Sequence, residues 1–435
     1  MSAADHWLLY GRCRLPVEFP DSVEVTVVRK PKMPVIHDPA AAVRDAIQHP
    51  SVPRSLPLFE VATSCRSACI AICDITRPVP NHVFLRPTLE TLIAAGIPRN
   101  AITILVATGL HRPNIGDELR ELIGDPWVFE NAEVVNHDAR CDRDHVDLGR
   151  TSTRGTPVKI NRRFAEADVR IATGLVEPHF MAGYSGGRKV IAPGVAHADT
   201  IRTFHSHAFM ANVAADNCNL DRNPLHEEQL QIVRMLGGAY AINTVIDEHR
   251  QLSFVNFGEI TASHAAAVQF IEPYCRVELE RDFRLVVTSA AGYPLDKTYY
   301  QTVKGMVGAI QILRPGGHLV IASECSEGIG SPEYIAAQKQ LHQLGPTGFL
   351  NSIENKPLAA IDEWQTQMQC KAVNAGQIHL YSSLSAADRR LTEVDCVNHL
   401  NRTIADLTQG TDDRSVALIP EGPYVIPYYQ GKTLH

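Results

Sequence analysis

The sequence lacks the features that define three broad classes of protein. No window approaches the run of about 18 apolar residues that a membrane helix needs, and charged residues interrupt residues 1–15 before any signal-peptide core forms. Its ten cysteines include no Cys-x-x-Cys pair, which is atypical of a disulfide framework. The 41 basic residues do not outnumber the 48 acidic residues, so a general nucleic-acid binder is disfavoured. We therefore expect a cytoplasmic protein with free thiols and no nucleic-acid or membrane partner.

The composition is that of an ordinary globular protein, with 45% hydrophobic and 20% charged residues in 435 residues, a length that favours two or three domains. Apolar runs typical of strands alternate with stripes typical of helices. Strands are expected at 68–74, 102–107, 169–172, 283–288 and 317–323, and helices at 85–93, 299–313 and 331–344. This alternation predicts an α/β fold built on parallel sheets.

A domain boundary is predicted near 275–283, where a Glu-Pro step and a charged stretch precede a new strand. The predicted N-terminal α/β domain covers 1–281 and the predicted C-terminal α/β domain covers 282–415. The Pro-rich, aromatic tail, 416–435, is expected to pack back on the N-terminal domain as an irregular segment. We expect the active site in the cleft between the domains.

Three predicted strands of the N-terminal half are followed by polar clusters, at 74–77, 108–112 and 177–189. In open α/β sheets ligands bind outside the carboxyl ends of the strands, so these loops are expected to meet. The third cluster holds Gly183, Gly186 and Gly187 before Arg188 and Lys189. It can bind a phosphate-bearing ligand, but it matches neither common phosphate-binding motif, and a solvated Gly-rich connector explains it equally well.

Two histidines follow these strands. His111 and His179 can serve as acid and base on opposite faces of a substrate, or they can be loop histidines bonded to backbone. Arg77, held between Thr76 and Pro78, can grip a carboxylate or phosphate, with Asp74 orienting it or binding a ribose hydroxyl. The alternative is a structural Asp–Arg pair that caps the following helix.

Other candidate groups carry weaker signals. Tyr300 and Lys304 share one face of a predicted helix and, with Gln301, either bind a carboxylate or form an ordinary helix surface. His205 and His207 suggest a metal ligand, as does His137, but 200–209 is predicted to be helical, so at most one of the pair at 205 and 207 can be a ligand. Cys65, Cys69 and Cys73 recur every four residues, but the strand predicted over the last two makes a metal role improbable.

Together these segments resemble the nickel-pincer lactate racemase family. The matching pieces run in the family's order: Asp74-Ile75-Thr76-Arg77-Pro78, Thr108-Gly109-Leu110-His111-Arg112, Glu177-Pro178-His179, Ser185-Gly186-Gly187-Arg188-Lys189, His205 and Tyr300-Gln301-Thr302-Val303-Lys304. Each piece alone is weak, but six pieces in register form a strong signal that covers nearly the whole chain.

The resemblance implies a cofactor, nickel held by pyridinium-3,5-bisthiocarboxylic acid mononucleotide. By motif position Lys189 would carry it covalently, His205 would complete the nickel coordination, and Gly186 and Gly187 would let the backbone pass close to the nucleotide. Asp74, Thr76 and Arg77 would also contact the cofactor. Separate enzymes make this cofactor and are therefore implied partners.

The resemblance also implies an isomerase, a racemase or epimerase of a small-molecule 2-hydroxy acid. A hydride moves to the pincer and returns on the other face, while His111 and His179 exchange the hydroxyl proton. Arg77, Tyr300, Gln301 and Lys304 would bind the substrate, and Trp364 would line its pocket. The sequence leaves open which acid is the substrate. Its oligomeric state also stays open.

The resemblance does not by itself select the side chains that face the substrate's third carbon. Leu110, Phe180 and Met181 suggest an apolar component, whereas Tyr184 and Arg188 could accept a polar substituent. Two rival functions stay open at this point. One is a zinc hydrolase that uses His111, His179 and His205 with Glu177, and the other is a non-catalytic hydroxy-acid binder on the same fold.

Overall fold

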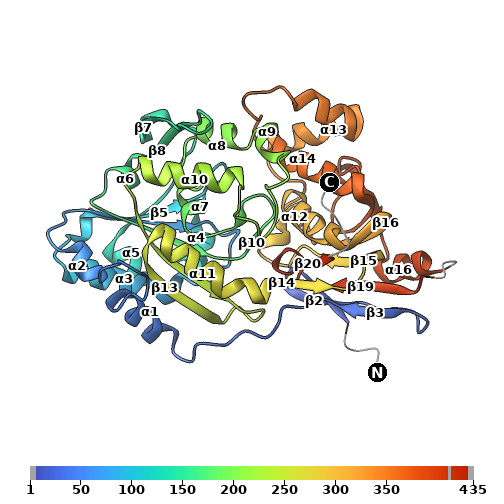
Figure 1. Cartoon of the computed structure of the whole chain (residues 1–435), viewed down its shortest axis with the longest axis horizontal. Helices are drawn as coiled ribbons and strands as arrows, with labels where there is room; N and C mark the ends of the chain where they lie inside the picture. Colours follow the sequence, from blue (N-terminus) through green and yellow to red (C-terminus); the bar gives the residue numbers. More distant parts are fainter. Residues whose placement is uncertain (1–5, 410–412, 430–435) are drawn as a thin grey trace.

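The computed structural model describes residues 6–409 and 413–429, and two six-stranded sheets organise them (Figure 1). The first sheet runs in spatial order β13 (Leu252–Glu259), β12 (Tyr240–Ile246), β9 (Val169–Leu175), β4 (Ala68–Cys73), β5 (Ile102–Ala107), β6 (Glu133–Asn136). The second runs β18 (Asp395–Val397), β17 (Gly376–Tyr381), β16 (Leu313–Ala322), β15 (Phe283–Ser289), β19 (Ser415–Ile419), β3 (Glu24–Val27). Neighbouring strands are parallel except β12 and β13. The predicted α/β class is confirmed.

Helices cover the two sheets. The first part of the chain contributes α1 (Pro39–Gln48), α2 (Leu58–Ala62), α3 (Asn81–Ala94), α4 (Gly116–Ile123), α5 (Pro126–Asn131), α10 (Pro224–Met235) and α11 (Ile260–Cys275). The second contributes α12 (Tyr299–Ala309), α13 (Pro332–Ile353), α14 (Glu363–Ala375) and α16 (Leu400–Thr408). In α3 the predicted apolar stripe is buried at Leu85, Leu89 and Leu92 and packs with the β4 and β5 side chains in one core cluster. Burial of this stripe fixes the loop before α3, which carries Asp74 and Arg77.

Two predicted helices have different limits in the structure. The helix predicted over 299–313 ends at Ala309, and Leu313 already begins β16 because it pairs with Phe283 of β15. The helix predicted over 200–209 is two short helices, α8 (Ala198–Phe204) and α9 (His207–Met210). The break between them falls at residues 205 and 206, where backbone hydrogen bonding restarts from the N-cap Ser206.

The sheets divide the chain differently from the predicted boundaries. Near the N-terminus, β3 forms an edge of the second sheet and pairs only with β19. The tail is expected to be irregular, but all five side chains of β19 are buried and the strand lies inside the second sheet, between β15 and β3. Continuous apolar runs of this kind fit the interior of a parallel sheet. Farther along, β20 (Ile426–Tyr429) pairs with β14 (Arg276–Leu279), and residues 430–435 of the predicted tail lie outside the described residues.

Two expectations about the whole chain can be compared with the structure. All ten cysteines are free thiols, as the dispersed spacing predicts. Within residues 6–409 and 413–429, no helix combines the length and apolar character needed to cross a bilayer.

Candidate functional site

Three adjacent strand ends create the main pocket. β9, β4 and β5 are neighbours in the first sheet, and the strand order reverses around β4, which is where α/β sheets bind ligands. The loops after these strands face α12 and the start of α14 across an inner pocket of about 130 Å³. The polar lining side chains are Cys73, Asp74, Thr76, Arg77, Thr108, His111, His179, Ser185, Lys189, His205, Tyr300, Lys304, Asp362, Trp364 and Gln365. The structure thus brings together most of the residues singled out in the sequence.

A larger outer chamber of about 710 Å³ adjoins this pocket and shares Asp74, His111, Tyr300 and Asp362 with it. Gln301 lines the outer chamber and is absent from the inner pocket. The predicted grouping of Gln301 with Tyr300 and Lys304 at one carboxylate edge therefore differs from the structure. The reason is helical geometry: positions 300 and 304 share a face of α12, whereas 301 is turned about 100° away.

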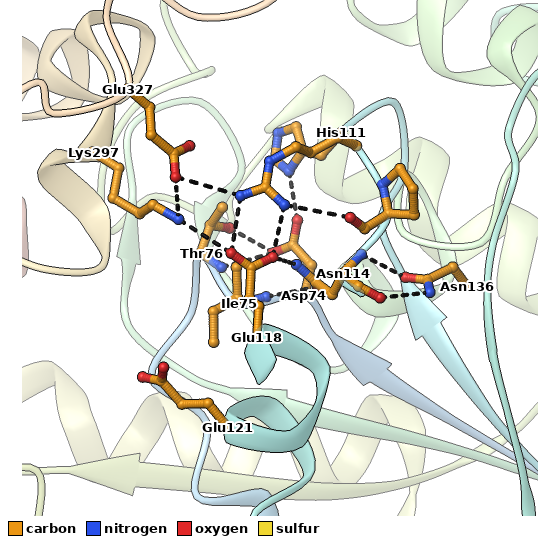
Figure 2. A network of polar contacts seen from close by, with 12 residues as sticks. Asp74, Ile75, Thr76, His111, Asn114, Glu118, Glu121, Asn136, Lys297 and Glu327 are labelled. Atoms are coloured by element: carbon orange, nitrogen blue, oxygen red, sulfur yellow. Dashed lines mark hydrogen bonds and ion pairs between the residues drawn. The ribbon is translucent and has the colours of Figure 1, made fainter. Parts of the chain in front are cut away.

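An ionic network crosses the rim of the outer chamber (Figure 2). Arg112 pairs with Glu118 at 2.7 Å and with Glu327 at 3.4 Å, and Lys297 pairs with the same two carboxylates at 3.3 and 2.6 Å. Arg112 and Glu118 follow strands of the first sheet, whereas Lys297 and Glu327 follow strands of the second. These partly exposed pairs connect the two parts of the chain at the entrance.

His111 is held by a carboxylate. Its Nδ1 lies 2.6 Å from Asp74 Oδ2, and the Thr76 hydroxyl donates to Asp74 Oδ1 at 2.6 Å (Figure 2). Burial acts to raise the pKa of Asp74, but the His111 ring and the Thr76 hydroxyl outweigh it, and the pKa lies below its ordinary value. Asp74 is therefore ionised and accepts the hydrogen bond from the Nδ1–H of His111, and Nε2 is the ring nitrogen that makes no bond to Asp74.

His179 has a different environment. It is buried, and its Nδ1 accepts long contacts from the backbone N–H groups of Met181 at 3.4 Å and Ala182 at 3.2 Å. Burial, followed by the charges of Lys189, Arg77 and Lys304, holds its pKa well below the ordinary range. The ring is therefore neutral with its proton on Nε2.

Three cations surround His179. Burial, then Arg77, lowers the pKa of Lys189 to about 7, and burial lowers the pKa of Lys304 well below its ordinary value. Arg77 forms an ion pair with Glu177, and Asp74 pairs with His111, so the structure has two separate pairs in place of the Asp74–Arg77 pair that the sequence left open as an alternative. The two side chains point toward different loops: Asp74 contacts His111 in the loop after β5, whereas Arg77 contacts Glu177 in the loop after β9. The pocket is thus electropositive and suits an anionic ligand.

His205 presents one unbonded ring nitrogen. Its Nδ1 donates to the carbonyl oxygen of Ile201 at 2.9 Å, so Nε2 keeps its lone pair. The ring lies 4.8 Å from the Trp364 ring, and burial lowers the His205 pKa to about 3. His207 does not line the pocket, consistent with the expectation that at most one of the two histidines is a ligand. His137 lines the outer chamber, where it contacts Ala196 and Asn161.

The Gly-rich segment owes its glycines to protein packing. A Cβ on Gly186 would lie 2.7 Å from Val176 Cγ2, and one on Gly187 would lie 2.9 Å from His264 Cβ. Both residues have positive φ, +78° and +46°, which side chains disfavour. Gly186 lines the inner pocket but Gly187 does not, so the expectation that both glycines approach a nucleotide differs from the structure at Gly187. The side chains of Tyr184 and Arg188 are also absent from the lining.

Three polar lining residues were not predicted to line the pocket: Asp362 and Gln365 carry no signal in the sequence, and Cys73 was considered only for a metal role. Cys73 is the last residue of β4, and burial raises its pKa to about 11; its position before the Asp74 loop could have indicated it. Asp362 has a left-handed backbone, with φ of +64°, and its Oδ2 accepts a 2.5 Å hydrogen bond from Ser331. Gln365 donates to the Tyr300 carbonyl oxygen at 2.5 Å. The last two come from a distant segment, and no local pattern marks them.

The zinc-hydrolase alternative requires several donors around one point. His111 Nδ1 is committed to Asp74, and Glu177 is committed to Arg77. Across the part of the chain that the structure describes, no three His, Cys, Asp or Glu side chains are grouped so that they could hold one metal ion. This donor arrangement disfavours a three-histidine zinc site.

Comparisons with known proteins give a consistent result. Residues 10–217 match the model of the lactate racemase N-terminal domain, and residues 280–426 match the lactate racemase C-terminal domain. The chain is 30% identical over 363 residues to the lactate racemase of Thermoanaerobacterium thermosaccharolyticum, covering 82% of this chain and 83% of the relative. It is 34% identical over 313 residues to that of Lactiplantibacillus plantarum, covering 72% of each.

Solved structures agree with these matches. The lactate racemase apoprotein of T. thermosaccharolyticum superimposes with a TM-score of 0.87 at 27% identity, covering 97% of this chain and 99% of that one. A Thermotoga maritima protein superimposes with a TM-score of 0.70 at 16% identity, covering 90% of this chain and 99% of that one. The second likeness shows a shared fold alone.

Proposed function

The chain belongs to the lactate racemase family and is an isomerase, and on that premise we propose that it inverts the C2 stereocentre of a 2-hydroxy acid, with lactate the first substrate to test. The observation that carries the proposal is the pair of histidines on one pocket. His111 and His179 come from different strand ends, and both line the inner pocket beside three cations. A racemase that works by hydride transfer needs groups that take up and return the hydroxyl proton of both enantiomers, and a binding protein needs no such groups.

The residues present fit a nickel-pincer nucleotide. Lys189 is the attachment point in this proposal, because a lysine with a pKa of about 7 presents a substantial fraction of neutral, nucleophilic amine near neutrality. His205 is the nickel ligand, because its Nε2 is unbonded while Nδ1 is fixed on Ile201, the usual arrangement of a metal-binding imidazole. When bound, the group supplies a reversible hydride acceptor. Arg77, Thr76 and Asp74 contact its polar parts, and Gly186 leaves room at the pocket wall.

The cations bind the acidic substrate. Lys304 and Arg77 attract its carboxylate, and Tyr300 and Trp364 close the pocket from the second part of the chain, where the Trp364 Nε1 donates to the Tyr300 hydroxyl at 3.2 Å. Gln301 lines the outer chamber and would contact the substrate from there. Burial makes these interactions strong, since fixed charges in a water-poor site need no reorganisation.

The two histidines move the hydroxyl proton. His111 takes it on Nε2, and Asp74 stabilises the imidazolium that forms. His179 serves the opposite enantiomer. To accept a proton on Nε2 it must shift its own proton to Nδ1, and the contacts there, 3.2 and 3.4 Å long, are weak enough to give way. The bound anions offset the surrounding cations and allow His179 to become charged.

Intact-protein mass combined with metal analysis tests the proposal on protein co-expressed with the enzymes that make the pincer. The wild type is expected to show a mononucleotide-sized adduct with nickel, and Lys189→Ala is expected to show neither. Loaded protein is then expected to interconvert the two enantiomers of lactate or of another 2-hydroxy acid in a panel. An unmodified wild-type mass with zinc or no metal would contradict the proposal and favour the binder or the hydrolase.

A further inference from the structure

Arg188 is a buried cation without an acidic partner. Its side chain is 1% exposed and is the largest fully buried side chain among the described residues. Burial alone accounts for the lowering of its pKa, to about 9, and in residues 6–409 and 413–429 no Asp or Glu forms an ion pair with it. A desolvated, unpaired charge is costly, so a residue serving stability alone would be better apolar.

The guanidinium donates to three acceptors and contacts one further ring. Its Nη1 and Nη2 reach the carbonyl oxygens of Tyr184 at 3.0 Å and Ala182 at 2.9 Å. Its Nε donates to His226 Nδ1 at 2.9 Å, and Nη1 lies 2.7 Å from His264 Nε2, which is itself 2.9 Å from the Ser185 carbonyl oxygen. Because a guanidinium can only donate and a carbonyl oxygen can only accept, His226 Nδ1 carries a lone pair, whereas His264 Nε2 carries the proton that it donates to Ser185. Burial and the Arg188 charge lower the pKa of each.

The two carbonyls belong to the segment that links His179 to Lys189. Ala182 contributes an N–H to His179 Nδ1 and a carbonyl to Arg188. Lys189 directly follows Arg188 in the short helix α7 (Arg188–Ile191), and its N–H donates to the Gly186 carbonyl oxygen at 3.0 Å. One guanidinium therefore fixes the backbone on which both pocket side chains depend.

We propose that Arg188 is a positioning residue, which clamps the Ala182 and Tyr184 carbonyls from behind the pocket and so holds His179 and Lys189 in place. His226 serves as its side-chain acceptor. The proposal rests on the proposed function only for the roles of His179 and Lys189, because the clamp itself is formed by the chain alone.

The test uses the full chain without cofactor. Reductive methylation with formaldehyde and cyanoborohydride, read by peptide mass spectrometry, gives the rate at which the Lys189 amine reacts as a function of pH, with the exposed Lys339 as internal reference. In the wild type the rate is expected to reach half its maximum near pH 7. In Arg188→Lys, which keeps the charge but cannot span two carbonyls, Lys189 is expected to reach solvent and react at least tenfold more slowly at pH 7, relative to Lys339.

A second readout follows His179. Nitrogen-15 shifts of its ring report which nitrogen carries the proton, and Arg188→Lys is expected to abolish the wild-type preference for Nε2–H. Arg170→Lys is the matched control, because Arg170 also donates to two backbone carbonyls, of Ala165 and Leu236, but lies away from the pocket. It is expected to change neither readout.

A loss of thermal stability in Arg188→Lys with both readouts unchanged would overturn the proposal and leave a structural role. If Arg188→Lys does not fold, His226→Leu decides, because it removes the side-chain acceptor of the Arg188 guanidinium; an unchanged Lys189 profile would then overturn the proposal. A wild type that never acquires an adduct, combined with a shifted Lys189 profile in Arg188→Lys, would reject the proposed function but support the clamp.

Discussion

His111 and His179 line the same pocket, yet their surroundings are opposite in charge. His111 is half-exposed and bonded to an ionised carboxylate, whereas His179 is buried among Lys189, Arg77 and Lys304. The first environment places an anion beside the ring, whereas the second surrounds the ring with cations that, together with burial, hold the pKa of His179 well below its ordinary range. The two histidines of the proposed proton path therefore sit in opposite electrostatic environments until an anionic ligand enters the pocket. Ligand binding is expected to make protonation of His179 easier, and no such coupling is expected at His111.

The largest expected effect comes from removing either ring. In cofactor-loaded protein, His111→Gln and His179→Gln are each expected to lower kcat by about 10²–10⁴-fold with both enantiomers, because each direction uses both rings. His37→Gln, at an exposed position, is the control. Rates are measured by chiral chromatography. Retention of activity within tenfold of wild type by one variant would mean that a single histidine serves both faces.

A smaller loss is expected when only the partner of His111 is changed. Asp74→Asn keeps the shape of the side chain but removes the charge that orients the His111 ring. Changing a group that orients a functional histidine typically lowers activity by about 10–100-fold. Because the effect acts through His111, Asp74→Asn is expected to add nothing in the His111→Gln background. Cofactor loading of each variant is checked by mass. Multiplying losses in the cofactor-loaded double variant would show that Asp74 contributes to turnover through its proposed cofactor contact as well as through His111.

The smallest expected effect is on the free energy of unfolding and concerns Lys189, one of the cations around His179. The folded protein lowers the pKa of Lys189 to about 7 from about 10.4 when unfolded, so folding binds fewer protons between these values. The lysine thus destabilises the fold fully below pH 7, and the penalty fades as the pH rises to about 10.4. Lys189→Met is therefore expected to stabilise the cofactor-free protein by about 1–3 kcal/mol at pH 6.

Urea unfolding at pH 6 and pH 10 measures this stability effect, with Lys339→Met on the exposed face of α13 as the control. The gain from Lys189→Met is expected to shrink at pH 10. A variant that is less stable than wild type at both values would show that Lys189 is not strained by burial, and the contrast between the two histidine environments would lose its electrostatic basis.

Much of the first sheet could be predicted because its signals are local. The strand 102–107 has the predicted limits, and the α3 stripe is buried as predicted. The meeting of the three loops follows from the rule that ligands bind at the strand ends where the order reverses. Partners distant in sequence could not be predicted in the same way. Nothing near residue 24 indicates that β3 pairs with β19, and nothing near Arg77 indicates Glu177 instead of Asp74.

The glycines illustrate a second limit of the sequence. A Gly-rich stretch before two cations suggests a phosphate loop, yet Gly187 is required by His264, a residue 77 positions later. Arg188 suggests a ligand contact and instead turns into the interior. A sequence shows which residue types are present on a loop. Which of them face the pocket and which face the interior depends on elements that are distant in sequence and become neighbours only in the fold.

The position of β19 sets the order in which the molecule can be assembled. All strands of the first sheet lie between residues 68 and 259, so this sheet can form while the ribosome is still adding the second half. The second sheet must wait for Ser415–Ile419, because that strand separates β15 from β3 and is the only strand that pairs with β3 among the described residues. A nascent chain stalled before residue 415 would therefore hold the loops after β4, β5 and β9 while the second sheet is still incomplete.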